Sequence, residues 1–170
     1  MVLPARLKAE FDELCTHYPQ KRAGLIPALH RCQEEHGGWL PPEVLEDLAA
    51  YFELEPVEVF GVASFYPMFH LEPVGQHVIS VCHNISCALR GAESVLRQVC
   101  TLTGARPGLS GTSSDGRFTV KRVECQGACA NAPMLEVGGQ YHEDLDEAKV
   151  SAIVHGLMAK GTGLRSGVKR

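Results

Sequence analysis

Residues 77–104 read HVISVCHNISCALRGAESVLRQVCTLTG, and within this stretch the pattern of apolar residues changes once. The first part, HVISVC (77–82), is short and rich in β-branched side chains, which is typical of a strand. In the second part, 87–104, apolar residues recur at helical spacing and Gly104 would end the helix. The residues that share this apolar face are Leu89, Ala92, Leu96 and Val99. The stretch therefore predicts a strand followed by a helix.

The sequence after this unit continues the alternation of strands and helices. RFTVKRVEC (117–125) alternates as a strand, and MLEVGGQYH (134–142) is typical of two short strands joined by a turn at Gly138 and Gly139. A closing helix is expected from Asp146 to Lys160, with the acidic residues of HEDLDE (142–147) capping its start. The predicted order is βαβββα. The first two strands should be parallel, because a helical crossover joins them.

The sequence before residue 66 is helical in pattern throughout. Apolar residues recur at helical spacing over 7–18, 25–36 and 44–52, and a shorter helix follows Pro56. This fourth segment, with Val57 and Phe60, is apolar nearly all round, so we expect it to be buried between neighbours. We therefore expect a two-part α+β chain: a helical bundle over 1–70, an α/β domain over 71–160 and a flexible tail over 161–170.

Composition excludes several classes of function. The chain has 170 residues, a net charge of −4 and a pI near 6.0, which argues against nucleic-acid binding. No apolar run reaches the roughly 20 residues that a membrane helix needs, and the first 15 residues carry acids in place of a signal peptide. We expect a cytoplasmic protein without direct membrane insertion. Seven cysteines, an odd number, favour metal or redox use over a disulfide framework.

Four cysteines follow the two parallel strands: Cys82, Cys87, Cys125 and Cys129. Because the carboxyl ends of parallel strands meet at one edge of a sheet, we expect these thiols to close over one small object. The small residues of QGACANA (126–132) leave room for an iron–sulfur cluster, and two pairs of ligands suit a [2Fe–2S] cluster best. A helix that begins at Cys87 should favour its thiolate.

Other sites are compatible with parts of this pattern. Four thiolates also suit structural zinc, whereas thiol–disulfide exchange lacks its usual Cys-x-x-Cys motif. His83 could suggest a Rieske-type site, but a second Cys/His pair is missing. Arg90 could tune a cluster or simply meet solvent. The remaining cysteines lie on or beside apolar helix faces and are expected in the core: Cys15, Cys32 and Cys100.

Three stretches are distinctive: GVASFY (61–66), VCHNISCALRGAE (81–93) and DGRFTVKRVECQGACANAPM (115–134). They resemble the E subunit of NADH:quinone oxidoreductase (complex I), a thioredoxin-like [2Fe–2S] ferredoxin family, over roughly residues 10–160. The resemblance implies a helical N-terminal region, a thioredoxin-like α/β domain and one [2Fe–2S] cluster on the four cysteines.

The resemblance also implies a partner and a location. The neighbouring F subunit, called the flavin subunit below, would carry NADH and FMN, and the cluster would exchange single electrons with the flavin. The chain would lie in the peripheral arm of a membrane-associated complex, on its cytoplasmic side. No Gly-x-Gly-x-x-Gly follows a strand here, so neither nucleotide and no catalytic residue is expected on this chain.

Two alternatives to this assignment remain open at this point. Soluble NAD-linked formate dehydrogenases and hydrogenases have a related electron-input subunit, and a zinc-stabilised interaction module would have no redox role. The apolar stretch GVASFYPMF (61–69) either docks the flavin subunit or packs within the bundle.

Overall fold

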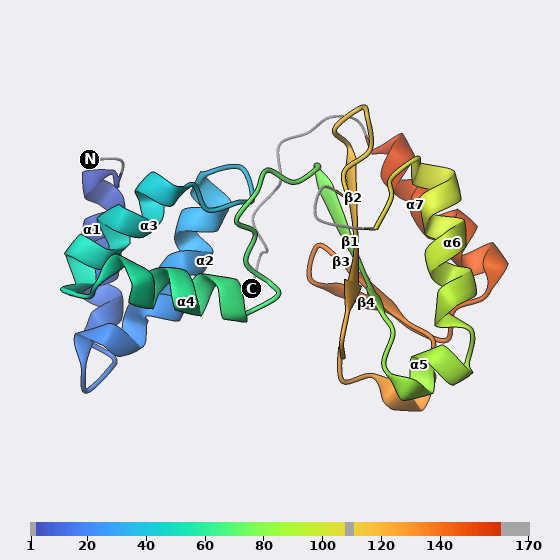
Figure 1. The fold of residues 1–170 in the computed structure, drawn as a ribbon, viewed down its shortest axis with the longest axis horizontal. Coiled ribbons are helices and arrows are strands. Elements are labelled where there is room, and N and C mark those ends of the chain that lie inside the picture. Colours follow the sequence, from blue (N-terminus) through green and yellow to red (C-terminus); the bar gives the residue numbers. More distant parts are fainter. Residues whose placement is uncertain (1–2, 108–110, 161–170) are drawn as a thin grey trace. The chain divides into compact units, whose positions relative to one another are not determined.

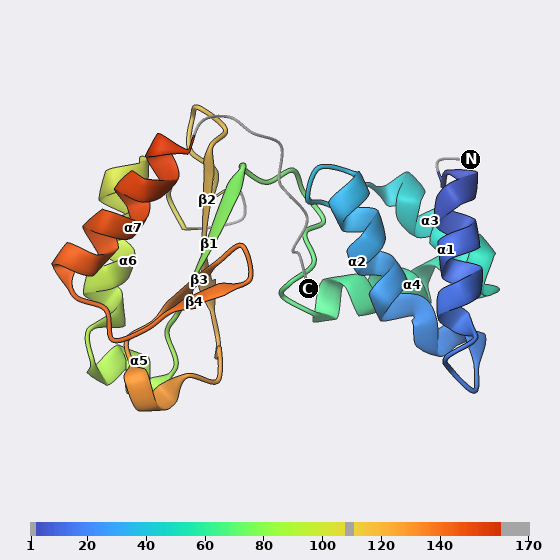
Figure 2. The same cartoon turned by 180° about the vertical axis from the view of Figure 1, so that it is seen from behind.

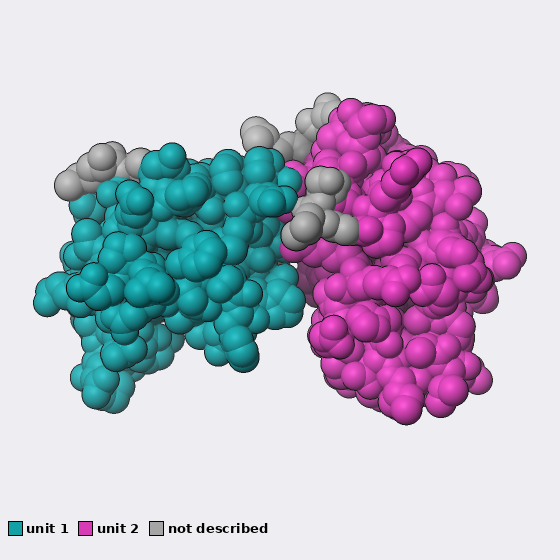
Figure 3. Space-filling view, viewed as in Figure 1, with its two compact units in different colours: residues 1–73 teal, residues 74–170 magenta. Residues whose placement is uncertain are grey.

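The computed structural model describes residues 3–107 and 111–160 (Figure 1). The chain divides into two compact units, residues 1–73 and 74–170, which are coloured separately in Figure 3. The expected tail over 161–170 lies outside the described residues. Within the described residues, no helix is both long enough and apolar enough to cross a membrane.

The first unit is built from helices, as predicted. It contains α1 (Ala5–Cys15), the 3₁₀ turn η1 (Lys21–Gly24), α2 (Leu25–Glu35), α3 (Pro42–Phe52) and α4 (Pro56–Phe65). A proline occupies the first turn of α3 and of α4, where its missing N–H costs no helical hydrogen bond. At α4 the side chains of Glu55 and Glu58 also form a capping box. Local sequence therefore determines where these helices start.

One face of each helix contributes to the core of this unit. Its fully buried side chains include Leu7 and Phe11 of α1, Leu29 of α2, Leu48 of α3 and Val59 of α4. The repeating apolar positions that predicted the helices are thus the ones that pack. Tyr18 is an exception, because α1 ends at Cys15 and this side chain is exposed.

The expected burial of α4 on all sides is wrong. Val59 and Ala63 are buried, but Val57 is 73% exposed, Phe60 52% and Phe65 77%. Burial requires a neighbouring element on each side, and α4 packs mainly against α3 and α2. Its outer face is left as an apolar surface, within the part of the chain that the structure describes.

The second unit contains a four-stranded sheet in the order β2-β1-β3-β4. The strands are β1 (His77–Cys82), β2 (Phe118–Val123), β3 (Leu135–Val137) and β4 (Gln140–His142). β1 and β2 are parallel, as predicted, while β3 pairs antiparallel with β1 and with β4. The hairpin turn at Gly138 and Gly139 has positive φ values of 62° and 81°, which confirms the predicted diglycine turn.

The helix expected over 87–104 is two helices. α5 (Ile85–Leu89) and α6 (Ala92–Thr103) are separated at Gly91, whose φ of 96° a continuous helix cannot contain. Leu89 therefore does not share the buried face of α6 and is 82% exposed. The rest of the predicted face is correct, since Leu96 and Val99 are buried, and Gly104 ends α6 with a φ of 68°.

Helix α7 (Glu147–Ala159) packs beside α6, and both helices cover the same face of the sheet (Figures 1 and 2). Val150, Val154 and Leu157 of α7 are buried there, whereas Ile153 is partly buried. Asp146 accepts a hydrogen bond from the Lys149 N–H at 2.7 Å, so the predicted acidic cap is confirmed.

The first residues of the second unit are fixed to the sheet by Gly75. Its N–H donates to Thr119 Oγ1 at 2.7 Å. A Cβ at this position would lie 2.7 Å from the Phe118 backbone, so the close approach requires glycine.

Candidate metal centre

The four predicted ligands follow β1 and β2 at one end of the sheet. Cys82 is the last residue of β1 and pairs with Val123, the last residue of β2, which precedes Cys125 by two positions. Beyond the strands, α5 carries Cys87, and the 3₁₀ turn η2 (Cys129–Asn131) starts at Cys129. Figures 1 and 2 both show α5 beside the orange η2 segment at the lower end of the sheet. The shared edge expected from parallel strands is therefore confirmed.

Cys82 and Cys87 form a buried pair. Their residues are 2% and 1% exposed, and they pack in one small cluster with Val123, Ala132 and Met134. Burial, followed by a hydrogen bond with Cys82, raises the pKa of Cys87 to about 11. Nearby Cys129 acts in the same direction, so the second loop approaches this pair closely enough to influence it.

The expectation that a helix end favours the thiolate of Cys87 is wrong. Helix α5 begins at Ile85, so Cys87 lies in its first turn, but the helix has only five residues and its dipole is correspondingly weak. Loss of hydration on burial disfavours the thiolate more than the dipole of so short a helix favours it. The pKa of Cys87 is therefore raised, and its thiol is neutral at neutral pH. A hydrogen bond with the Met134 backbone acts in the opposite direction and lowers the pKa of Cys87, but burial outweighs it.

Cys125 and Cys129 form the second, exposed pair. The N–H of Gly127 donates to Cys125 Sγ at 3.4 Å, and Gly127 has a φ of 75° that residues other than glycine adopt with strain. A backbone donor directed at sulfur is the kind of contact that stabilises a metal-bound thiolate. Gly127 therefore lets the backbone approach the Cys125 thiol.

The end of this loop is anchored by its own carbonyl groups. Each C=O over residues 131–134 accepts a hydrogen bond from outside the loop. The Asp144 N–H donates to the Asn131 oxygen at 2.6 Å, and the Arg90 Nε–H donates to the Ala132 oxygen at 3.4 Å. The Leu145 N–H donates to the Pro133 oxygen at 3.1 Å, and the Cys82 N–H donates to the Met134 oxygen at 3.3 Å. The sequence reasoning missed these contacts and the fully buried Met134, because the donors are distant in sequence and no motif links them.

The donor set fits a two-iron cluster. What the described residues present is one buried pair of thiols and one exposed pair on the neighbouring loop. A [2Fe–2S] cluster needs one pair per iron, whereas tetrahedral zinc needs all four sulfurs about one ion.

The other candidate ligands make contacts of their own. His83 pairs with Glu124 at 3.6 Å. Cys32 is buried in the helical core, and Cys15 and Cys100 pack beside the cores of their units, as predicted.

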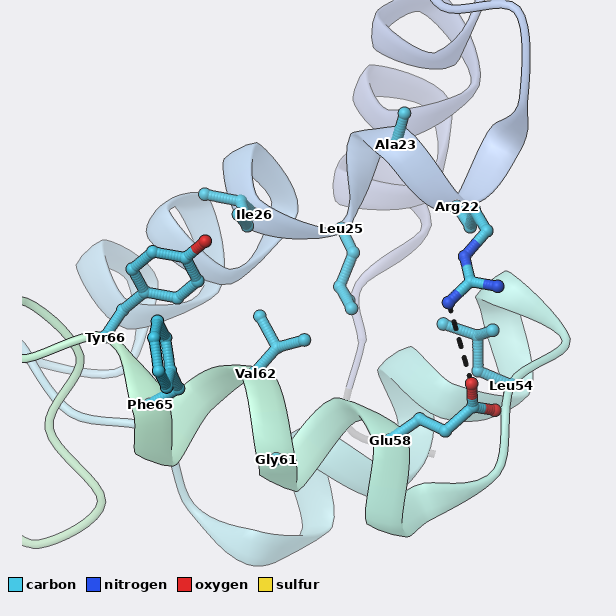
Figure 4. Close-up of a pocket in the computed structure, with 10 residues that line it drawn as sticks. All are labelled: Arg22, Ala23, Leu25, Ile26, Leu54, Glu58, Gly61, Val62, Phe65 and Tyr66. Carbon is cyan, nitrogen blue, oxygen red and sulfur yellow. Dashed lines mark ion pairs between the residues drawn. The ribbon is translucent and has the colours of Figure 1, made fainter.

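A separate hollow of about 540 Å³ lies within the helical unit (Figure 4). Apolar side chains of η1, α2 and α4 line most of it, with Phe65 and Tyr66 at one end and the Arg22–Glu58 ion pair, at 3.6 Å, at the other. This lining offers contact area and no reactive group, so the hollow is a candidate binding surface.

Known proteins resemble this chain over most of its length. A family model described as thioredoxin-like [2Fe-2S] ferredoxin matches residues 11–158. NADH-quinone oxidoreductase E subunit 2 of Rhizobium meliloti (strain 1021) is 40% identical over 153 residues, which is 90% of this chain and 89% of that protein. The NADH-quinone oxidoreductase E subunit of Rickettsia conorii is 35% identical, over 86% of this chain and 87% of its own.

A further relative has a different subunit name, and a solved structure is less similar in sequence. NADH-quinone oxidoreductase subunit 2 of Thermus thermophilus is 38% identical over 87% of this chain and 82% of that protein. An NAD+-reducing [NiFe]-hydrogenase in its air-oxidised state superimposes with a TM-score of 0.68 and 25% identity. That match covers 81% of this chain but 23% of the hydrogenase chain.

Proposed function

This chain belongs to the thioredoxin-like [2Fe-2S] ferredoxin family, and from that premise we propose that it is an electron-transfer subunit of NADH-quinone oxidoreductase. It holds one [2Fe–2S] cluster through four cysteines: Cys82, Cys87, Cys125 and Cys129. The parallel pairing of β1 with β2 carries the proposal, because it delivers both cysteine pairs to one edge of the sheet.

In this proposal, residues of this chain bind the cluster, shield it from water and orient it. When bound, such a cluster accepts and releases one electron at a time. Cys82 and Cys87 would hold it from the buried side, where the fully buried Met134 packs beside them. Cys125 and Cys129 would hold it from the exposed side, and the Gly127 N–H would help to stabilise the sulfur charge. Because ligation requires thiolates, the raised pKa of Cys87 means that cluster insertion releases its proton.

The other redox groups of the proposed reaction are assigned to a partner subunit. We assign NADH and FMN to the neighbouring flavin subunit, which exchanges single electrons with the cluster. The assembled complex would place this chain in a peripheral arm on the cytoplasmic side of the membrane. A hydrogenase or a formate dehydrogenase that uses NAD is the second candidate, supported by the hydrogenase superposition. Neighbouring genes for membrane quinone-reductase subunits favour the first candidate, and genes for a nickel or molybdenum enzyme favour the second.

The apolar outer face of α4 is the proposed docking surface for the flavin subunit. It comprises Val57, Phe60 and Phe65 of α4 together with Met68, which follows the helix, and their exposed fractions lie between 42% for Met68 and 77% for Phe65. Exposed aromatic side chains gathered on one helix are typical of the centre of a protein interface. The hollow beside Phe65 and Tyr66 adds a recess that a partner side chain can fill.

Cluster content tests the function directly. The full-length chain, purified without oxygen, should contain iron and acid-labile sulfide in equal amounts and give a rhombic EPR signal after reduction with dithionite. Cys125→Ala should lose most of the iron and the signal. Cys100→Ala is the matched control, because this partly buried cysteine lies in the same unit and outside the site, and it should retain both.

Two results would overturn the assignment. One is stoichiometric zinc in a colourless wild-type protein, and the other is full iron content in Cys125→Ala.

A further inference from the structure

Arg90 lies between the two segments that carry the cysteines. It follows α5, the helix of Cys87, and its Nε–H donates to the carbonyl oxygen of Ala132 at 3.4 Å, across 42 positions of sequence. Ala132 lies in the loop that follows Cys129, is 4% exposed and packs with Cys82 and Cys87.

Arg90 differs from the other donors to residues 131–134. The Asp144 and Leu145 N–H groups come from the segment before α7, and the Cys82 N–H comes from β1. Arg90 alone among them reaches this loop from the turn that carries Cys87, and it does so through a side chain. Its hydrogen bond therefore limits how far that turn and the Cys129 loop can separate.

Arg90 also differs from the other cations near this end of the sheet. Arg122 is paired with Glu93 at 2.8 Å, and Lys149 with Asp144 at 3.3 Å. Within the described residues, no carboxylate lies within ion-pair distance of Arg90. Its charge is therefore not cancelled locally. A positive charge favours the more negative form of a neighbouring group, and adding an electron makes a cluster more negative.

We propose that Arg90 is a positioning residue for the cluster, which ties the Cys87 turn to the Cys129 loop and favours the reduced state through its charge. This inference rests on the proposed [2Fe–2S] function. The two roles are carried by different atoms, the Nε–H for the tie and the whole guanidinium for the charge, so substitutions can separate them.

Two variants of the cluster-loaded, full-length chain make this separation. Arg90→Gln retains an N–H₂ group at the position of Nε and removes the charge. Its midpoint potential should fall by about 59 mV, a tenfold change in the reduced-to-oxidised ratio for a one-electron couple, while cluster loss to a chelator keeps its wild-type rate. Arg90→Lys retains the charge and replaces Nε by a methylene group. Its potential should stay at the wild-type value, while the cluster is lost about threefold faster.

Controls make the outcome decisive. Arg90→Met should show both changes. Arg106→Gln removes the same charge beyond the far end of α6, a helix about 18 Å long, and should leave the potential unchanged. The proposal is overturned if Arg90→Gln and Arg106→Gln shift the potential equally, or if Arg90→Met has the wild-type potential and rate of cluster loss. A wild-type chain without iron and sulfide would instead contradict the proposed function itself.

Discussion

Individual cysteines acquire different chemistry from their surroundings in this chain. Cys32, Cys82 and Cys87 are buried, Cys15 and Cys100 are partly buried, and Cys125 and Cys129 are exposed. Burial raises the pKa of each of three cysteines outside the site: Cys15, Cys32 and Cys100. A thiol with a raised pKa is neutral at neutral pH, and these three thiols lie outside the site, so they behave as small apolar side chains.

Cys32 provides a pH-dependent prediction for the helical unit. Burial raises the pKa of its thiol from 9.0 to about 12. The folded state therefore favours the neutral thiol, and this contribution is complete below pH 9 and is lost as the pH rises toward 12. Within that window each pH unit should lower the free energy of unfolding by up to about 1.4 kcal/mol.

The measurement compares wild type with Cys32→Ala by urea unfolding between about pH 8 and about pH 10.5, a range that spans the onset of this titration. The chain's single tryptophan, Trp39, lies in the helical unit and reports on its unfolding. Cys32→Ala should be less stable at the lower pH, and the difference should shrink as the pH rises, since all other titrations are common to both. Parallel pH curves for the two proteins would refute this role of Cys32.

At the scale of single elements, helix α7 depends on a cap that its sequence specifies. Asp146 adopts an extended backbone conformation before the helix, and its side chain accepts from the Lys149 N–H. Asp146→Ala should lower stability by about 1 kcal/mol, which corresponds to about fivefold faster amide exchange in α7, measured by hydrogen–deuterium exchange.

Asp146→Asn separates the hydrogen bond from the charge in this prediction. Asparagine caps helices about as well as aspartate, so this variant should exchange within about twofold of wild type. Equal acceleration in both variants would show that the negative charge near the helix start, and not the accepted hydrogen bond, stabilises α7.

The sequence was sufficient to predict helices, strands and turns whose position is determined by neighbouring residues. Prolines in first turns, the diglycine turn and the β-branched residues of β1 are properties of neighbouring residues, and the corresponding elements were correct. The break at Gly91 was missed because periodicity does not report the φ angle of a glycine. The exposure of Leu89 and Phe60 was missed because burial depends on which distant segment lies opposite.

The candidate metal site shows the same difference between features set by neighbouring residues and features set by distant segments. The cysteine spacing and the strand order predicted which end of the sheet would carry all four thiols. The difference between a buried and an exposed pair was beyond the sequence, since it arises from Met134 and Ala132 returning to cover β1. The contact of Arg90 with Ala132 was also beyond the sequence, because the two residues are 42 positions apart and no motif links them.

At the scale of the whole molecule, the two units have cores of their own. One core is formed by residues between 3 and 69, and the others by residues between 79 and 157. The proposed cluster belongs to the second unit, whereas the exposed aromatic surface on α4 belongs to the first. A subunit that uses one unit for electron transfer and the other for docking should therefore lose the two properties independently.

Phe60→Ser and Phe65→Ser should weaken association with the flavin subunit without damaging the fold. Both side chains are more than half exposed, so each change should alter the free energy of unfolding by no more than about 0.5 kcal/mol. Loss of an aromatic side chain at the centre of an interface should raise the dissociation constant at least about tenfold. Titration of the purified flavin subunit against the cluster-loaded chain measures that constant.

Tyr18→Ser is the matched control for this docking surface, because Tyr18 is an exposed aromatic residue of the same unit outside α4. It should bind the flavin subunit as wild type does. Iron content and the EPR signal should be unchanged in all three variants, since their cysteines are intact. Wild-type affinity in both Phe60→Ser and Phe65→Ser would contradict docking through α4, and a loss of cluster in either would show that the helical unit supports the metal site as well.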